Sequence, residues 1–157
     1  MKETTIDTIK PKHTAELRRL FKRAVAEDFN YFPAEYQQKV LRDNNLPRLF
    51  VATLRPSRIL LGARKGNQMI GYVIAGINGN DTGKIYWLYV SPEGRGLNLG
   101  QGLLKRALKE MRARGMQRAS LVTHDYADYY KKFGFTLDKA EELYGVNMKV
   151  MSYVWPN

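Results

Sequence analysis

An apolar run, a glycine-rich turn and an amphipathic segment follow one another directly between residues 85 and 112. The run Ile85–Val90 has the length and the branched and aromatic side chains of a buried strand. Pro92 cannot continue this strand, because proline lacks the N–H that a sheet ladder requires. From Leu99 onward, apolar side chains recur on one face of a helix and basic side chains on the other. The sequence therefore predicts a strand, a tight turn and a helix in immediate succession.

The turn between this strand and helix is suited to an anion. It contains the glycines Gly94, Gly96, Gly100 and Gly102. The first N–H groups of a helix have no internal partner, and glycine lets the backbone approach a ligand closely. Asn98 tolerates a positive φ better than most residues, and no acidic side chain lies between Arg95 and Lys109. We therefore predict that the turn binds phosphate or pyrophosphate, the alternative being an ordinary connection whose glycines only form the turn.

Two common nucleotide motifs are absent from the chain. The P-loop string G-x-x-x-x-G-K-[ST] does not occur, and the dinucleotide motif G-x-G-x-x-G fails because Leu99 follows Gly94 and Gly96 where the third glycine belongs. The turn residues instead resemble the acyl-CoA signature of the GCN5-related N-acetyltransferase (GNAT) family, R/Q-x-x-G-x-G/A after a V-x-P strand exit. The chain reads Val90-Ser91-Pro92 and then Arg95-Gly96-Leu97-Asn98-Leu99-Gly100, with Asn98 in place of the first motif glycine.

A second segment carries the same resemblance. Residues 129–135 read YYKKFGF, which is similar to the "YY..FGF" segment of the GNAT family, where a tyrosine often lies beside the CoA sulfur. The order of predicted elements along nearly the whole chain is similar to that of the family as well. The resemblance implies transfer of an acyl group, usually acetyl, from CoA to a primary amine.

Periodicity predicts the remaining elements. Strands are expected at 4–10, 58–64, 68–77, 117–123, 135–139 and 146–154, and helices at 14–26, 33–44, 46–55 and 126–132. The pattern of 46–55 also fits a strand, although we favour a helix. The helix after the turn connects two strands that should therefore be parallel neighbours, and Gly115 supplies its C-cap. The expected fold is one α/β domain over residues 1–157, with a mixed six- or seven-stranded sheet flanked by helices and a β-α-β acyl-CoA-binding unit.

Length and charge restrict the setting of the protein. A chain of 157 residues is one domain by size, and it contains no cysteine, which excludes disulfides, thiolate metal sites and a thiol nucleophile. We expect no metal. No segment has the length of a membrane span and the N-terminus lacks the apolar core of a signal peptide, so the cytoplasm is the expected compartment and a membrane is not an expected partner. The net charge of +11 favours acidic partners but is also that of a well-solvated basic surface.

The resemblance to the GNAT family implies a set of residues that contact acetyl-CoA, the expected co-substrate. In the family, the central strand diverges from the next parallel strand below the turn. Backbone groups of the central strand would then pair with the pantetheine amides, and the turn would hold the pyrophosphate. The residues implied are Leu88, Tyr89 and Val90 of the strand, and Arg95, Gly96, Leu97, Asn98, Leu99, Gly100 and Gln101 of the turn.

Transfer to an amine requires a neutral amine and a proton for the departing thiolate. Tyr130 is the candidate general acid by its match to the family segment, with Tyr129 as the substitute if the register differs by one. The ordinary pKa of a tyrosine hydroxyl, near 10, is close to that of a thiol. His124 is the candidate general base, because it follows a strand near the expected acyl group and has the ordinary pKa of such a group. Asp28, Glu27 or a chain of waters are equally admissible bases.

Three questions stay open from the sequence. Many GNAT enzymes carry a glutamate on the central strand, roughly where this chain has Tyr86 and Trp87, so a non-catalytic CoA-sensing module is one alternative function. A nucleic-acid- or ribosome-associated protein is a second, although the basic residues are dispersed rather than gathered. The acceptor is unidentified: a peptide N-terminus, a lysine, a polyamine, an aminoglycoside and a small amine all fit. A homodimer is compatible with the sequence.

The aromatic loop Asp28–Pro33 allows two interpretations. Phe29, Tyr31 and Phe32 can cover the core where two helices meet, or they can form the wall of a pocket. The sequence does not distinguish between these roles.

Overall fold

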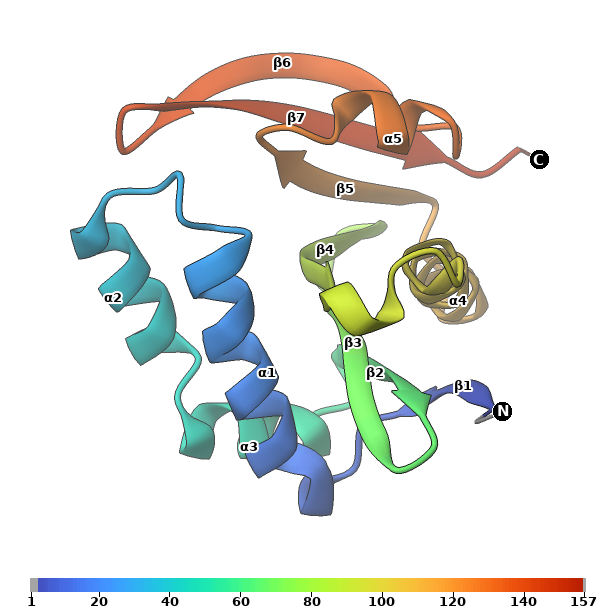
Figure 1. Ribbon diagram of the computed structural model, residues 1–157. Coiled ribbons are helices and arrows are strands. Elements are labelled where there is room, and N and C mark those ends of the chain that lie inside the picture. Colours follow the sequence, from blue (N-terminus) through green and yellow to red (C-terminus); the bar gives the residue numbers. More distant parts are fainter. Residues whose placement is uncertain (1–2, 157) are drawn as a thin grey trace.

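One seven-stranded mixed sheet runs through the computed structural model, which describes residues 3–156 (Figure 1). The strands are β1 (Thr4–Thr8), β2 (Arg58–Lys65), β3 (Gln68–Ile77), β4 (Thr82–Val90), β5 (Arg118–Thr123), β6 (Thr136–Leu143) and β7 (Val146–Val154). Their order across the sheet is β1-β2-β3-β4-β5-β7-β6. All neighbouring pairs are antiparallel except β4 and β5, which are parallel, as the β-α-β interpretation requires.

Helices cover both faces of this sheet (Figure 1). They are α1 (Thr14–Glu27), α2 (Ala34–Asp43), α3 (Leu46–Leu54), α4 (Leu99–Ala113) and α5 (Ala127–Lys131), with short 3₁₀ turns η1 (Pro11–His13) and η2 (Pro92–Gly94). Side chains of α1 to α3 pack with one face of β2 to β4, and those of α4 and α5 pack on the other. The sheet thus separates two hydrophobic clusters.

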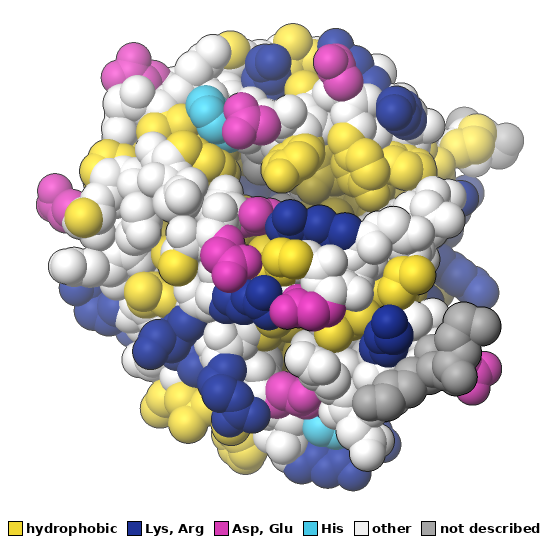
Figure 2. All heavy atoms as spheres, in the orientation of Figure 1, with side chains coloured by type: hydrophobic (Ala, Val, Ile, Leu, Met, Phe, Trp, Pro, Cys, Tyr) yellow, Lys and Arg dark blue, Asp and Glu magenta, His cyan; other side chains and the backbone are white. Residues whose placement is uncertain are grey.

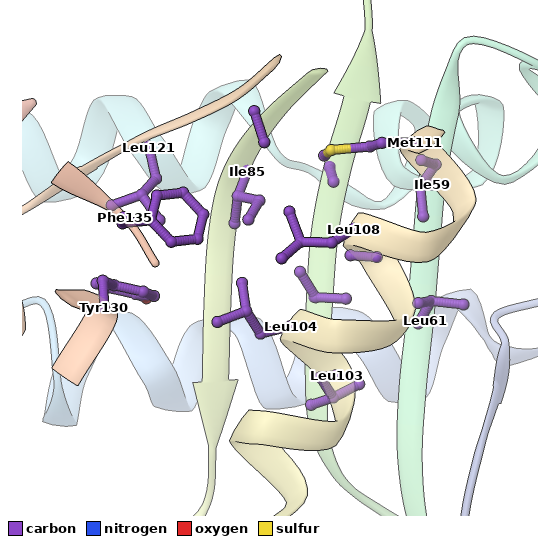
Figure 3. Close-up of a cluster of buried hydrophobic side chains, with 14 of the residues drawn as sticks. Ile59, Leu61, Ile85, Leu103, Leu104, Leu108, Met111, Leu121, Tyr130 and Phe135 are labelled. Carbon is purple, nitrogen blue, oxygen red and sulfur yellow. The ribbon is translucent and has the colours of Figure 1, made fainter. Parts of the chain in front are cut away.

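Helix α4 fixes the position of the strand–turn–helix unit. Leu103, Leu104 and Met111 of its inner face are fully buried, and Figure 3 shows this face directed at β4 and at Tyr130. The helix approaches β4 so closely that a Cβ at Gly83 would lie 2.5 Å from the Met111 sulfur. This packing leaves the N-terminus of α4, where the glycine-rich turn lies, at the end of β4.

The α/β fold with its seven-stranded sheet is confirmed, and residues 46–55 form a helix, but some boundaries differ from expectation. Strand β4 begins at Thr82 rather than Ile85, and β6 extends to Leu143. Nearly every residue of β6 is exposed, because it is an edge strand, so no apolar alternation marks its length. Pro33 is the N-cap of α2 rather than part of its first turn.

The two central strands separate partway along their length. Strand β4 pairs with β5 only through Thr82–Lys84, which faces residues 118–120, and the two strands diverge beyond that point (Figure 1). In the β3–β4 register, Ile74 faces Trp87 and Ala75 faces Ile85, so Tyr86 is an extra residue in β4. Such a bulge increases the local twist and bends the strand. The bulge therefore lies where β4 turns away from β5.

None of the helices in the described part of the chain is both long and apolar enough to span a membrane.

Candidate active site

A first cavity of about 330 Å³ lies between the end of β4, the glycine-rich turn and α5, and we name it the turn cavity. Of the residues that the sequence indicates as CoA contacts, all except Leu97 line it: Leu88, Tyr89, Val90, Arg95, Gly96, Asn98, Leu99, Gly100 and Gln101. Leu97 is 43 % exposed and stays outside. The turn and the outer end of β4 thus form one continuous surface.

The backbone of the turn has the geometry that an anion site requires. Asn98 is the N-cap of α4 and has the left-handed φ of 58°, and Gly96 has a φ of 80°. The first N–H groups of α4 lack partners within the helix and point toward the turn, at the positive end of the helix dipole. The first turn of α4 contains no acidic residue. Asn98 therefore takes the left-handed conformation that glycine would otherwise supply.

A second cavity, of about 300 Å³, lies beside the first, and we name it the aromatic cavity. It is lined by β4 from Lys84 to Leu88, by the end of β5, by residues 28–36 before and within α2, and by β6 and β7. Asp28, Leu88, Tyr126 and Tyr130 line both cavities. The two cavities therefore adjoin in the opening between β4 and β5. Both interpretations of the aromatic loop hold, since Phe32 is buried and also lines this cavity.

Two adjacent tyrosines of α5 have different surroundings. Tyr130 lies at the junction of the two cavities, and Figure 3 shows it beside Phe135. Burial raises the pKa of the Tyr130 hydroxyl, whose residue is only 8 % exposed. Tyr129 lines the turn cavity alone, and its hydroxyl lies 3.1 Å from the place that a Cβ on Gly100 would take. Tyr130 is thus the tyrosine that faces both cavities.

The candidate bases His124 and Glu27 differ in their hydrogen-bond partners, and neither lines the two cavities. His124 has both ring nitrogens engaged: Nδ1 is 2.9 Å from the Asn147 carbonyl oxygen and Nε2 is 3.3 Å from Asp125 Oδ1. Within residues 3–156, the linings of the two cavities do not include His124. Glu27 lies at the surface, where it accepts hydrogen bonds from Arg23 and from the Tyr89 hydroxyl.

Asp28 lies at the junction itself. Burial raises the pKa of its carboxyl, and the nearby Arg95 guanidinium opposes this rise. Arg95 Nη2 is 3.3 Å from Asp28 Oδ1, and Arg95 Nε donates to the Val90 carbonyl at 3.4 Å. Arg95 therefore joins the end of β4 to the segment that follows α1. Leu88 and Tyr126 also line both cavities, and Tyr126 is a residue that the sequence did not indicate, because no motif includes it.

The described residues offer no metal centre, and the face drawn in Figure 2 has no single basic patch. Among residues 3–156, no group of three or more His, Asp and Glu side chains is placed to hold a metal. Figure 2 shows Lys and Arg spread over the visible face and interspersed with Asp and Glu. Across the middle of this face a hollow is bordered by hydrophobic side chains. The visible charges thus agree with a dispersed basic surface.

Known proteins share this architecture. A family model described as "Acetyltransferase (GNAT) family" matches residues 15–135. The structure of the PaiA N-acetyltransferase from Thermoplasma acidophilum in complex with coenzyme A superposes with a TM-score of 0.80 at 20 % identity, over 98 % of this chain and 99 % of that one.

Two further solved structures show the same fold. The ribosomal-protein-S18-alanine N-acetyltransferase from Escherichia coli has a TM-score of 0.74 at 17 % identity, over 97 % of this chain and 94 % of that one. The aminoglycoside 6′-acetyltransferase type Ii has a TM-score of 0.77 at 18 % identity, over 98 % and 99 %. Their names give different acceptors, so the shared fold alone does not indicate what this chain acetylates.

Proposed function

Because the chain belongs to the acetyltransferase (GNAT) family, we propose that it transfers an acetyl group from acetyl-CoA to a primary amine. The observation that carries this proposal is the pair of adjoining cavities between β4 and β5. One cavity is lined by the glycine-rich turn, the other is lined by no residue of that turn, and Tyr130 lines both. Two substrates entering from opposite sides would bring their reacting atoms together there.

The turn cavity supplies the contacts that CoA requires. Backbone N–H groups at the start of α4 would bind the pyrophosphate, and Gly96 and Gly100 leave the space for it. Beyond Lys84, β4 has no paired neighbour on its β5 side, so the peptide groups of Leu88 and Val90 can pair with the pantetheine amides as an added strand would. A CoA-bound relative with the same fold supports this assignment.

Residues at the junction supply the proton transfers. The attacking amine must be neutral, and we assign Asp28 as the group that accepts its proton, because Asp28 lines both cavities and His124 does not. The amine nitrogen then bonds to the thioester carbonyl carbon and loses its second proton to solvent. The carbon–sulfur bond breaks, Tyr130 protonates the CoA thiolate, and solvent returns a proton to Tyr130. The chain contains no cysteine to carry the acetyl group, so direct transfer in a ternary complex is the proposed route.

A CoA-sensing module without activity is the alternative. It would keep the turn cavity but would need no acid or base beside the thioester. The presence of Tyr130 and Asp28 at the junction favours the enzyme, even though the central strand has Tyr86 and Trp87 where many relatives have glutamate.

The test is acetyl-CoA-dependent thiol release measured with a panel of amines. The protein contributes no background thiol because it lacks cysteine. We expect amine-dependent release together with acetylated product by mass spectrometry. Tight CoA binding with no turnover for any amine would instead support the sensing module, and absence of CoA binding would contradict both.

A further inference from the structure

The aromatic cavity carries information about the acceptor. We propose that it binds a small arylalkylamine, a primary amine joined through a short alkyl chain to an aromatic ring. This inference rests on the proposed function, and it names the class of amine that the second substrate belongs to. Three observations support it: the lining, the charges and the volume of the cavity.

Aromatic side chains make up much of the lining of the aromatic cavity. The aromatic side chains are Phe29, Tyr31, Phe32, Tyr36, Tyr86, Trp87, Tyr126 and Tyr130. Aromatic faces and edges pack well against another ring, and they also attract an ammonium group. The same wall can therefore hold the body of an arylalkylamine and receive its amine in the charged form. The junction with Asp28 then lies at the end where the amine must lose its proton.

The charged side chains of the lining already have partners. They are Asp28, Lys84 and Glu141. Asp28 pairs with Arg95, Glu141 Oε2 lies 3.5 Å from Lys139 Nζ, and Lys84 Nζ lies 5.7 Å from the centre of the Tyr86 ring. A second ammonium, as in a polyamine, would compete with Lys139 for Glu141. An aminoglycoside would press many hydroxyl groups against ring faces, where they would lose hydrogen bonds to water.

Two aromatic contacts lie beside the cavity, and each involves one of its lining residues, Tyr36 or Tyr31. The rings of Tyr36 and Tyr144 stack with centroids 4.3 Å apart, which joins α2 to the β6–β7 hairpin. The rings of Tyr31 and His124 lie 4.5 Å apart, which joins the segment before α2 to the end of β5. Tyr144 has a φ of 52°, an uncommon value for a bulky residue, so the hairpin turn presents its ring to Tyr36 at a conformational cost.

The volume and the lining of the aromatic cavity favour a small acceptor. The volume of about 300 Å³ is at the lower end for small-molecule sites. A compact amine with a single charge fits these limits.

The first experiment compares initial rates for 2-phenylethylamine, spermidine, kanamycin and an alanine-terminated hexapeptide, each with saturating acetyl-CoA. We expect kcat/KM for 2-phenylethylamine to exceed the others by roughly tenfold or more, since a site discriminates by differential binding. A higher value for any other amine would overturn the acceptor assignment and leave the proposed function standing. No turnover with any amine would overturn the assignment as well, and calorimetry with CoA would then show whether the proposed function falls with it.

Variants locate the acceptor within the molecule. Tyr36→Ala removes a wall ring and its stack on Tyr144, so KM for 2-phenylethylamine should rise roughly tenfold while KM for acetyl-CoA stays nearly constant. Phe50→Ala removes a ring from the exposed face of α3 and should change neither constant. An unchanged amine KM in a folded Tyr36→Ala protein would overturn the proposal.

A binding readout independent of turnover is available from Trp87. The chain has two tryptophans, and Trp155→Phe leaves Trp87, in the wall of the aromatic cavity, as the sole tryptophan, which can be excited selectively over the tyrosines. With CoA bound, titration of 2-phenylethylamine should change Trp87 emission saturably, and spermidine should change it much less. Emission that does not respond to 2-phenylethylamine would contradict its binding there.

Discussion

Tyr130 lies at the junction of the two cavities. Its proposed role as general acid requires the hydroxyl oxygen, whereas a role in packing requires only the ring. Tyr130→Phe removes this oxygen and keeps the ring against Phe135, so folding and CoA affinity should change little. Loss of a positioned acid lowers the chemical step by roughly 10²–10⁴. We expect a fall of that size in the single-turnover rate, which excludes any masking by slow product release.

Tyr129→Phe is the matched control, because Tyr129 lines only the turn cavity. Its effect on the same rate should be several-fold milder. Full activity of Tyr130→Phe together with loss in Tyr129→Phe would move the acid by one residue. Full activity of both variants would mean that solvent protonates the thiolate.

Asp28 leads to a prediction about pH. As a base it must be ionised, so kcat/KM should fall as the pH drops through the pKa of Asp28, which burial raises above that of an ordinary aspartate. Asp28→Asn should remove this acid limb and lower kcat/KM at neutral pH by roughly 10². The controls are Asp125→Asn and His124→Gln. These two residues pair with each other and line neither cavity, so both variants should keep the fall in kcat/KM at low pH.

The same pKa direction predicts the sign of a stability effect for Asp28→Asn. Because the pKa of Asp28 is raised in the folded state, the native state holds the proton more tightly than the unfolded chain does. Ionised Asp28 therefore destabilises the fold at a pH above its folded pKa, and this cost is absent at a pH below its unfolded pKa. The thermal midpoint of Asp28→Asn relative to the natural protein should therefore be higher at pH 7 than at pH 3.5. The opposite order would show that pairing with Arg95 outweighs burial.

Individual residues of the site were predictable from the sequence where a motif fixes local geometry. The turn residues from Arg95 to Gln101 and the position of Tyr130 follow from such motifs, and all of them except Leu97 line the turn cavity. The place of Asp28 was not predictable, because it depends on how the segment after α1 packs against the end of β4, 60 residues or more along the chain. From the sequence alone His124 and Asp28 are equal candidates, and this packing is the observation that supports the proposal of Asp28.

Among the elements, the turn and α4 carry the cofactor prediction. Gly100→Val should abolish CoA binding in calorimetry, because a Cβ there would already lie 3.1 Å from the Tyr129 hydroxyl, and the larger side chain would fill space that a phosphate oxygen needs. The expected loss concerns the ligand and not the fold, since Gly100 lies in the first turn of α4 with ordinary helical geometry.

Gly115→Ala is the control for this prediction. Gly115 follows the other end of α4 with a φ of 88°, so alanine there should lower the thermal midpoint and leave CoA affinity unchanged. If a folded Gly100→Val protein binds CoA normally, the pyrophosphate site lies elsewhere.

Most elements could be predicted from the sequence because their apolar periodicity is strong. The helix from Leu99 and the strand pair around Gly66 are examples, since each has a clear period and a clear end. The bulge at Tyr86 could not be predicted, because it is defined by the pairing of β4 with β3 and produces no recognisable pattern of apolar residues in the sequence. The opening between β4 and β5 is expected from the family resemblance, whereas the bulge that bends β4 there is seen only in the three-dimensional pairing.

At the scale of the whole molecule, binding and folding are linked. A ligand that binds only the folded chain stabilises it by about 2.7 kcal/mol at a concentration one hundred times its Kd. For a chain of this length each kcal/mol raises the thermal midpoint by about 2–4 °C, so CoA at that concentration should raise it by several degrees.

ATP and NAD, at the same concentration as CoA, should raise the thermal midpoint clearly less, because they lack the pantetheine arm that pairs with β4. A purely electrostatic attraction to the +11 chain would instead give similar shifts for all three anions and would weaken steeply with salt. Equal shifts that disappear together in salt would therefore contradict a CoA site between β4 and β5, whereas a CoA-specific shift that persists would support it.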